Sequence, residues 1–115
     1  MSWRVLVEAV NLYKETDLAW AAGLIEGEGC FTLHSKKHPY FLLDMTDKDV
    51  LEKFQSIFPF VTLRGPYYHK DRPQYKPRWR IDAFGPKCRH IILQTYKYYG
   101  IRRRTCIDQL LEKTF

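Results

Sequence analysis

Residues 21–29 have the sequence Ala21-Ala-Gly-Leu-Ile-Glu-Gly-Glu-Gly29, which is the most informative part of the chain. Its apolar and small residues predict a helix that begins near Thr16 or Asp17, because either side chain can cap a helix N-terminus. Glycines at positions 27 and 29 are expected to end that helix, since glycine is the preferred residue at helix C-termini. The prediction is therefore a short helix that carries its acidic and glycine residues at one end.

One face of this predicted helix is almost without side chains. Ala19, Gly23 and Gly27 recur every four residues and so lie on the same side of the helix. Such a face allows another helix backbone to approach closely, as small-residue motifs do between membrane helices. We expect a helix–helix contact there.

Two glutamates, Glu26 and Glu28, lie at the C-terminal end of the same helix. The helix dipole disfavours a carboxylate there by about 0.3–1 kcal/mol, so a compensating interaction is expected. A hard divalent cation such as Mg²⁺ is one candidate, because it binds carboxylate and carbonyl oxygens. The alternative is that both side chains are solvated at a frayed helix end with an ordinary glycine cap.

The remainder of the chain predicts two hairpins, each followed by helices. Strands are expected at 30–35 and 40–45, and at 62–68 and 79–84, with a turn at 35–39 and a polar loop at 69–77. A capping box at Thr46-Asp-Lys-Asp49 predicts a helix that ends before Pro59. The sequence predicts two final helices, one from Pro86 to Gly100 and one from Arg102 to Lys113, the second with its inner face formed by Cys106, Ile107, Leu110 and Leu111.

This order of elements, αββαββαα, predicts an α+β domain with an antiparallel sheet. The length of 115 residues, with 45% hydrophobic residues, fits a single domain over 1–115. Residues 1–15 are treated as an N-terminal extension, because 3–13 fits a strand or a helix equally well.

The charge of the chain favours a polyanionic partner. Nineteen Lys and Arg against thirteen Asp and Glu give a net charge of +6, although a surface with excess lysine is the simpler alternative. The three cysteines, Cys30, Cys88 and Cys106, lack zinc-binding spacing and are expected to be reduced thiols. The four histidines also lack metal-ligand spacing. No segment predicts a membrane span or a signal peptide, so we expect an intracellular protein, cytoplasmic or nucleoid-associated, or organellar in a eukaryotic host.

The stretch from Ala21 to Gly29, followed by Cys30 and Phe31, resembles the LAGLIDADG motif of a family of homing endonucleases. Alanine stands for the first leucine and glutamate for both aspartates of that motif. Weaker similarity extends over residues 16–113. The resemblance implies a curved antiparallel sheet that binds double-stranded DNA, and a homodimer that forms through Ala19, Gly23 and Gly27.

The resemblance also implies the residues of an active site. Glu28 matches the metal ligand, with the Gly27 carbonyl as a second donor, and Asp47 matches a polar residue that organises water. Arg102 matches the active-site cation, with Arg103 and Lys97 as alternatives. The cofactor implied is Mg²⁺, with Mn²⁺ as a substitute and Ca²⁺ supporting binding without cleavage. An arginine cannot exchange a proton near neutral pH, so its role would be electrostatic.

Strand alternation places polar and charged side chains on one face of the predicted sheet. Arginines on such a face can read guanine in the major groove, whereas the alternative is the solvated face of an ordinary sheet. Tyrosines 67, 68, 96, 98 and 99 fit stacking on bases, but anchoring the core edges is the commoner role. The DNA-binding candidates are Thr32, His34, Lys36, Tyr40, Asp44, Arg64, Arg78, Arg80 and Asp82, with Lys70 and Arg103 as phosphate contacts.

Together these expectations describe a metal-dependent endonuclease that hydrolyses phosphodiester bonds of a palindromic or near-palindromic site. One motif per chain implies one half-site per chain, which is why a symmetric dimer is expected. Two alternatives remain at this point: an RNA-splicing maturase that binds intron RNA, and a catalytically inactive DNA-binding regulator of the same fold.

Overall fold

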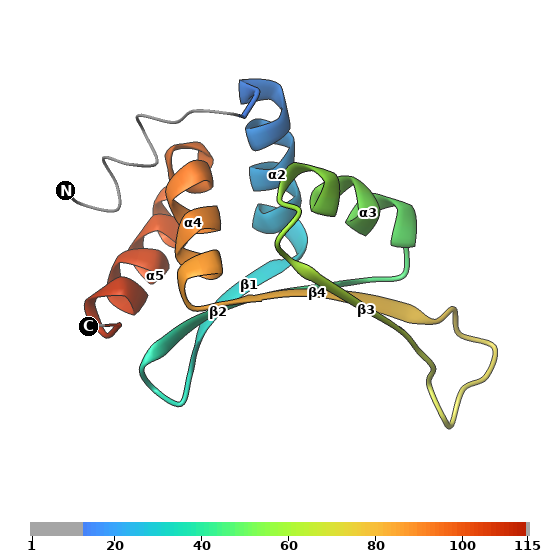
Figure 1. Ribbon diagram of the computed structural model, residues 1–115. Coiled ribbons are helices and arrows are strands. Elements are labelled where there is room, and N and C mark those ends of the chain that lie inside the picture. The colour runs from blue at the N-terminus through green and yellow to red at the C-terminus, as the bar shows by residue number, and fades with distance from the viewer. Residues whose placement is uncertain (1–12, 115) are drawn as a thin grey trace.

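The computed structural model describes residues 13–114, and its elements follow the predicted αββαββαα order (Figure 1). Most of the expected N-terminal extension lies outside the described residues. A short 3₁₀-helix, η1, continues α4. The elements are α2 (Glu15–Glu28), β1 (Gly29–His34), β2 (His38–Met45), α3 (Lys48–Ile57), β3 (Thr62–Tyr67), β4 (Arg78–Phe84), α4 (Pro86–Thr95), η1 (Tyr96–Tyr98) and α5 (Ile101–Glu112).

Within residues 13–114 the strands form one four-stranded antiparallel sheet in the order β1-β2-β4-β3. The two central strands, β2 and β4, pair from Tyr40 opposite Phe84 to Met45 opposite Trp79. In Figure 1 the sheet arches, with the helices on its convex side and both hairpin ends extending away from them. The predicted α+β class and the curved antiparallel sheet are confirmed.

The core lies between the helices and the convex face of the sheet. Every second residue of the central strands is buried there, as Phe41 and Leu43 of β2 and Ile81 and Ala83 of β4 show. Burial of each large apolar side chain contributes about 1.5–3 kcal/mol, so this alternation fixes which face of the sheet meets the helices. The helices contribute Leu18, Ile25, Leu51, Phe54, Ile91, Ile92 and Ile107, among others.

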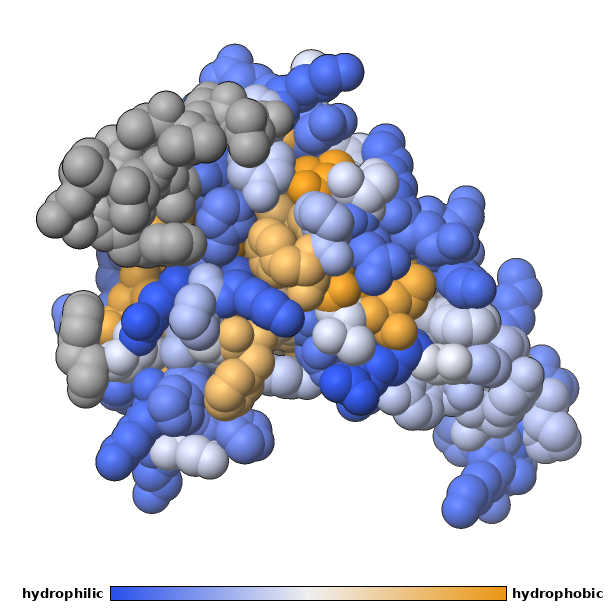
Figure 2. Space-filling view, viewed as in Figure 1, coloured by the Kyte–Doolittle hydropathy of each residue, from blue (hydrophilic) through white to orange (hydrophobic). Residues whose placement is uncertain are grey.

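Figure 2 shows the resulting surface from the same side as Figure 1. Hydrophobic residues are visible between the helices, and mostly hydrophilic residues cover the two lower ends of the sheet. In the described part of the chain, no helix has the length and apolar character needed to cross a membrane. All three cysteines are free thiols, as expected.

Helix starts differ in detail from the predictions. Helix α2 begins at Glu15 after Lys14, whose side chain makes no capping hydrogen bond, so the predicted caps Thr16 and Asp17 are wrong. Both residues lie in the first turn, where the helix dipole favours the carboxylate of Asp17. At α3, Asp47 holds the cap position without a side-chain hydrogen bond, so the predicted capping box does not form.

Two further corrections concern single residues. Lys36 was expected on the outer face of the first strand, but β1 ends at His34 and Lys36 lies in the turn with φ of 62°. Cys106 was expected to face inward from the last helix and is exposed, whereas Ile107 and Leu110 are buried. Periodicity alone allows the buried face of α5 to extend to either side of Ile107. The packing of α5 against β1 buries Leu110 and leaves Cys106 exposed.

Candidate active site and nucleic-acid interface

The junction between α2 and β1 depends on Gly29. A Cβ atom at this position would lie 2.9 Å from the Ile25 side chain and 3.0 Å from the Ile25 backbone. The Gly29 amide also donates to the Ile25 carbonyl and closes the helix. A side chain at residue 29 would have to displace Ile25, so glycine allows the chain to pass directly from α2 into β1.

Gly23 and Gly27 have no such role within the chain. A Cβ atom at either position would meet nothing within 4 Å, and both glycines are exposed, as is Ala19. Glycine inside a helix costs about 0.5–1 kcal/mol relative to alanine. The packing of the single chain gives no reason for that cost, so the small-residue face of α2 is open.

Glu26 is held within the chain by α5 and the turn before it. The Arg103 Nε atom donates to Oε1 over 3.0 Å, and the Gly100 amide donates to Oε2 over 3.1 Å. Arg103 also donates to the Glu26 carbonyl oxygen. The Gly100 hydrogen bond and the Arg103 guanidinium lower the pKa of this carboxyl, against a smaller opposing effect of burial. Glu26 is therefore a structural anion that ties the end of α2 to α5.

Glu28 has no comparable partner. Its side chain is exposed, and no hydrogen bond or ion pair to it forms among residues 13–114. A carboxylate beside the carbonyl oxygens at a helix C-terminus is the kind of donor set that suits a hard cation such as Mg²⁺. The described part of the chain contains no group of three or more His, Cys, Asp or Glu placed to hold a metal ion. Among the described residues, Glu28 is therefore not part of a ready-made cluster of three or more such side chains.

Asp47 and Arg102 lie at the same end of the sheet as Glu28. Gly29 pairs with Leu43, so the start of β1 lies beside the end of β2, and Asp47 follows that end directly. Arg102 follows Gly100, whose amide contacts Glu26, and its charge contributes to lowering the Glu26 pKa. Both side chains are exposed and unpaired among the described residues.

The two alternative cations are engaged elsewhere. Arg103 is bonded to Glu26 and only 13% of its side chain is exposed, which argues against its predicted role as a phosphate contact. Lys97 lies 3.2 Å from the Glu15 carboxylate, which raises the pKa of its ammonium group. Of the three candidate cations, Arg102 is the one whose charged group has no partner among the described residues.

The concave face of the sheet carries the predicted DNA-binding residues of the strands. Because opposite residues in an antiparallel pair share a face, the register forms cross-strand rows there. Phe84 is also on this face, 44% exposed and in contact with His34, and the prediction missed it. The rows are Thr32, Tyr40 and Phe84; Cys30, Leu42, Asp82 and Thr62; and Asp44, Arg80 and Arg64.

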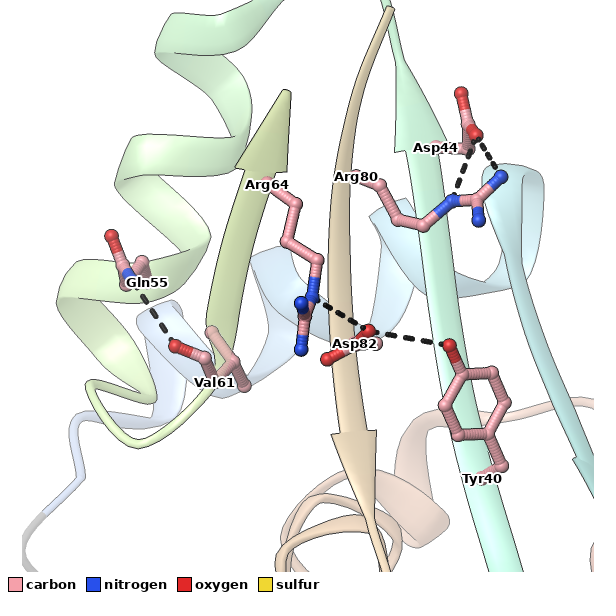
Figure 3. Close-up of polar contacts among 7 residues, drawn as sticks. All are labelled: Tyr40, Asp44, Gln55, Val61, Arg64, Arg80 and Asp82. Carbon is pink, nitrogen blue, oxygen red and sulfur yellow. Dashed lines mark hydrogen bonds and ion pairs between the residues drawn. The ribbon is translucent and has the colours of Figure 1, made fainter. Parts of the chain in front are cut away.

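Charged side chains on this face are paired with one another (Figure 3). Asp44 accepts two hydrogen bonds from Arg80, and its other oxygen lies 3.5 Å from Arg78 Nε. Asp82 lies 3.4 Å from Arg64 Nε and accepts a hydrogen bond from the Tyr40 hydroxyl. Burial, followed by the charge of Asp82, raises the pKa of Tyr40. Three arginines against two carboxylates leave this face with a net positive charge.

The loop between β3 and β4 forms a hollow beside the end of the sheet. Tyr67 and Tyr68 are 41% and 71% exposed, so the prediction that they anchor core edges is wrong, whereas Tyr99 is buried as predicted. Lys70 is exposed in the same loop. No local pattern in the sequence distinguishes these tyrosines, because their exposure depends on how far the hairpin extends beyond the core. The hollow is lined by Thr46, Tyr67, Tyr68, His69, Gln74, Tyr75, Lys76 and Arg78.

The fold is similar to solved structures of homing endonucleases, although neither protein-family models nor curated proteins give a match to the sequence. Homing endonuclease I-CvuI in complex with its target in the presence of calcium has a TM-score of 0.62 and 14% identity, over 84% of this chain and 64% of that chain. I-CvuI with an I-CreI target and magnesium, where the DNA is not cleaved, has a TM-score of 0.64 and 16% identity, over 85% and 65%.

Homing endonuclease I-TnaI has a TM-score of 0.58 and 17% identity, over 83% of this chain and 69% of that chain. The present chain thus spans less than two thirds of the I-CvuI chains that it matches. At these identities the likeness establishes the fold, which is the four-stranded antiparallel α+β fold described above.

Proposed function

We propose that this chain is one subunit of a homodimeric homing endonuclease that cuts double-stranded DNA with a divalent metal ion. The observation that carries the proposal is Glu28, an exposed and unpaired carboxylate at the end of a helix whose small-residue face is open. The rest of the fold leads from this helix directly into the sheet with the basic concave face. The solved structures of I-CvuI, which are complexes with DNA, support the same assignment.

The dimer would form through Ala19, Gly23 and Gly27, where two copies of α2 could approach backbone to backbone. Ile101, 85% exposed at the start of α5, supports this assignment. The Gly100 contact with Glu26 ties that start to the end of α2, the helix that carries the open face. Such a dimer would bring two Glu28 side chains together and would recognise a palindromic or near-palindromic site.

Glu28 and the Gly27 carbonyl of each subunit would hold Mg²⁺, with Mn²⁺ as a substitute and Ca²⁺ supporting binding alone. The ion would supply positive charge to the phosphate during phosphodiester hydrolysis. Arg102 would add a fixed cation beside the same phosphate, and Asp47 would accept a hydrogen bond from water at the end of β2. The concave face would contact the bases and Lys70 the phosphates.

Sequencing of cut ends tests the proposal directly. The purified protein is incubated with a library of randomised duplexes, with Mg²⁺ in one arm and EDTA in the other. We expect ends that share a long symmetric sequence in the Mg²⁺ arm alone. Duplex binding without any cut end would instead support the DNA-binding regulator, and preferential binding of intron RNA would support the maturase.

A further inference from the structure

We propose that Asp44 is a specificity-determining residue that positions Arg80 to read guanine. This inference rests on the proposed DNA-binding function of the concave face and adds a division of roles among its arginines. Asp44 would not itself contact the base. It would act by holding one edge of the Arg80 guanidinium, so that only the opposite edge meets DNA.

The contact between the two side chains is well defined. Asp44 and Arg80 are directly opposite in the β2–β4 register, and Arg80 donates from Nε over 3.3 Å and from Nη2 over 3.1 Å to Oδ2. Figure 3 shows both hydrogen bonds on the same side of the guanidinium. Asp44 is 22% exposed and Arg80 36%, so the pair is partly shielded from water. The Tyr67 ring lies 5.4 Å from the guanidinium carbon and restricts its movement further.

The consequence for recognition follows from guanidinium geometry. An arginine reads guanine O6 and N7 with two parallel N–H groups, which can come from the Nε–Nη2 edge or from the Nη1–Nη2 end. Asp44 occupies the Nε–Nη2 edge of Arg80, and the Nη1–Nη2 end of the guanidinium remains available to bind guanine. A side chain held in this way loses less conformational freedom when it binds a base.

The neighbouring arginines are held more loosely. Arg64 lies 3.4 Å from Asp82 through Nε alone and is 56% exposed, and Arg78 lies 3.5 Å from Asp44 and is 61% exposed. Arg64 and Arg78 are close enough to their carboxylates for an ion pair, but neither has the hydrogen-bond geometry that Arg80 has with Asp44. We therefore assign base discrimination chiefly to Arg80 and adaptable contacts to Arg64 and Arg78.

The charge of Asp44 gives this role a distinctive signature. A carboxylate on a surface that meets DNA opposes binding to any sequence, because it repels the phosphates. The same carboxylate favours the one DNA sequence whose guanine is bound by the positioned guanidinium of Arg80. Removal of the charge should thus weaken discrimination and strengthen non-specific binding, whereas loss of a merely stabilising contact would change both affinities in the same direction.

The test compares wild type with Asp44→Asn, which keeps the shape of the side chain. Duplexes are selected from a randomised pool in EDTA, and affinities are measured for the selected duplex, its variants and a scrambled duplex. We expect Asp44→Asn to reduce the guanine preference at one position per half-site about tenfold. Affinity for the scrambled duplex should rise about twofold. Arg80→Lys, which keeps the positive charge but lacks the two parallel N–H groups of the guanidinium, should lose the same preference.

Asp49→Asn is the matched control, because it removes the same charge from the exposed first turn of α3, on the helix side of the sheet. It should leave both affinities unchanged. A preference lost in Arg80→Lys but retained in Asp44→Asn would overturn the positioning role, as would an equal loss of affinity for all duplexes in Asp44→Asn. Failure of the wild type to bind any duplex would instead refute the proposed function itself.

Discussion

Glu26 and Glu28 lie two residues apart at the end of α2, yet their surroundings differ. Glu26 is bonded to Arg103 and to the Gly100 amide, whereas Glu28 is exposed and has no partner among the described residues. The glycines differ in the same way, since a Cβ atom at Gly29 would collide with Ile25 and one at Gly27 would meet nothing within 4 Å. The helix end therefore has an inner side that the fold of one chain requires and an outer side that it does not. Changes on the two sides should separate stability from function.

The largest difference is expected between Glu28→Gln and Glu26→Gln. Under the proposed function, Glu28→Gln removes a metal ligand with little change in shape and should reduce DNA cleavage at least about 100-fold while DNA binding is kept. Glu26→Gln should leave cleavage within about tenfold of wild type and lower the thermal midpoint instead. Cleavage rates on a selected duplex check both. Cleavage by Glu28→Gln at the wild-type rate would rule out Glu28 as a metal ligand.

The glycines provide a second comparison. Under the proposed function, Gly23→Leu should abolish the dimer at micromolar concentration but leave the monomer folded, because a Cβ atom at this position would meet nothing within 4 Å. Gly29→Ala should unfold more easily, by about 1–3 kcal/mol, because its Cβ would overlap Ile25. Sedimentation and denaturant unfolding measure the two effects. A Gly23→Leu protein that still sediments as a dimer would show that the subunits meet elsewhere.

Arg102 and Arg103 of α5 differ in the same way as the two glutamates. Arg103→Ala should lower the free energy of unfolding by about 1–3 kcal/mol, since it leaves Glu26 without its guanidinium partner. Arg102→Ala should change stability by less than about 0.5 kcal/mol, because its side chain is exposed and unpaired, and under the proposed function it should slow cleavage. Urea unfolding and cleavage assays on both variants test this. A loss in Arg103→Ala as small as that in Arg102→Ala would mean that the ion pair with Glu26 contributes little to stability.

The smallest effect is a pH dependence of stability. The Gly100 hydrogen bond and Arg103 lower the Glu26 pKa in the folded state, so the folded chain binds fewer protons at this carboxyl than the unfolded chain. The stabilisation is complete above the unfolded pKa of about 4.3 and is lost as the pH falls through the lower folded value. Glu26→Gln should weaken the acid sensitivity of unfolding between about pH 4.5 and the folded pKa. Identical acid profiles for the two proteins would contradict this assignment.

Local patterns predicted most of the fold because the relevant contacts are close in sequence. The alternation that buries Phe41 and Leu43 marks a strand, and Pro86 marks a helix start, whatever the partners are. The start of α2 was not predictable in this way, because Lys14 makes no side-chain cap that a sequence could reveal. The exposure of Cys106 depends on how α5 packs on β1, which is a non-local contact.

The same distinction between local patterns and non-local contacts applies to the candidate site. The acidic and small residues of α2 were visible in the sequence because they recur on one helix. The partner of Glu26 lies 77 residues away at Arg103, so its pairing could not be read locally. Likewise, the contact of Asp44 with Arg80 requires β2 and β4 to be neighbours, with β3 at the sheet edge. No periodicity encodes that crossover.

The close packing at Gly29 has a geometrical consequence for an assembly of two chains. Because Gly29 lies against Ile25 without a side chain, it fixes the direction in which β1 leaves the axis of α2. In the dimer of the proposed function, joined along α2, that direction would set the tilt of each sheet against the twofold axis and hence the spacing between the two half-sites. A larger residue at this corner, if tolerated, would alter the length of the recognised sequence while every side chain on the concave face stayed the same.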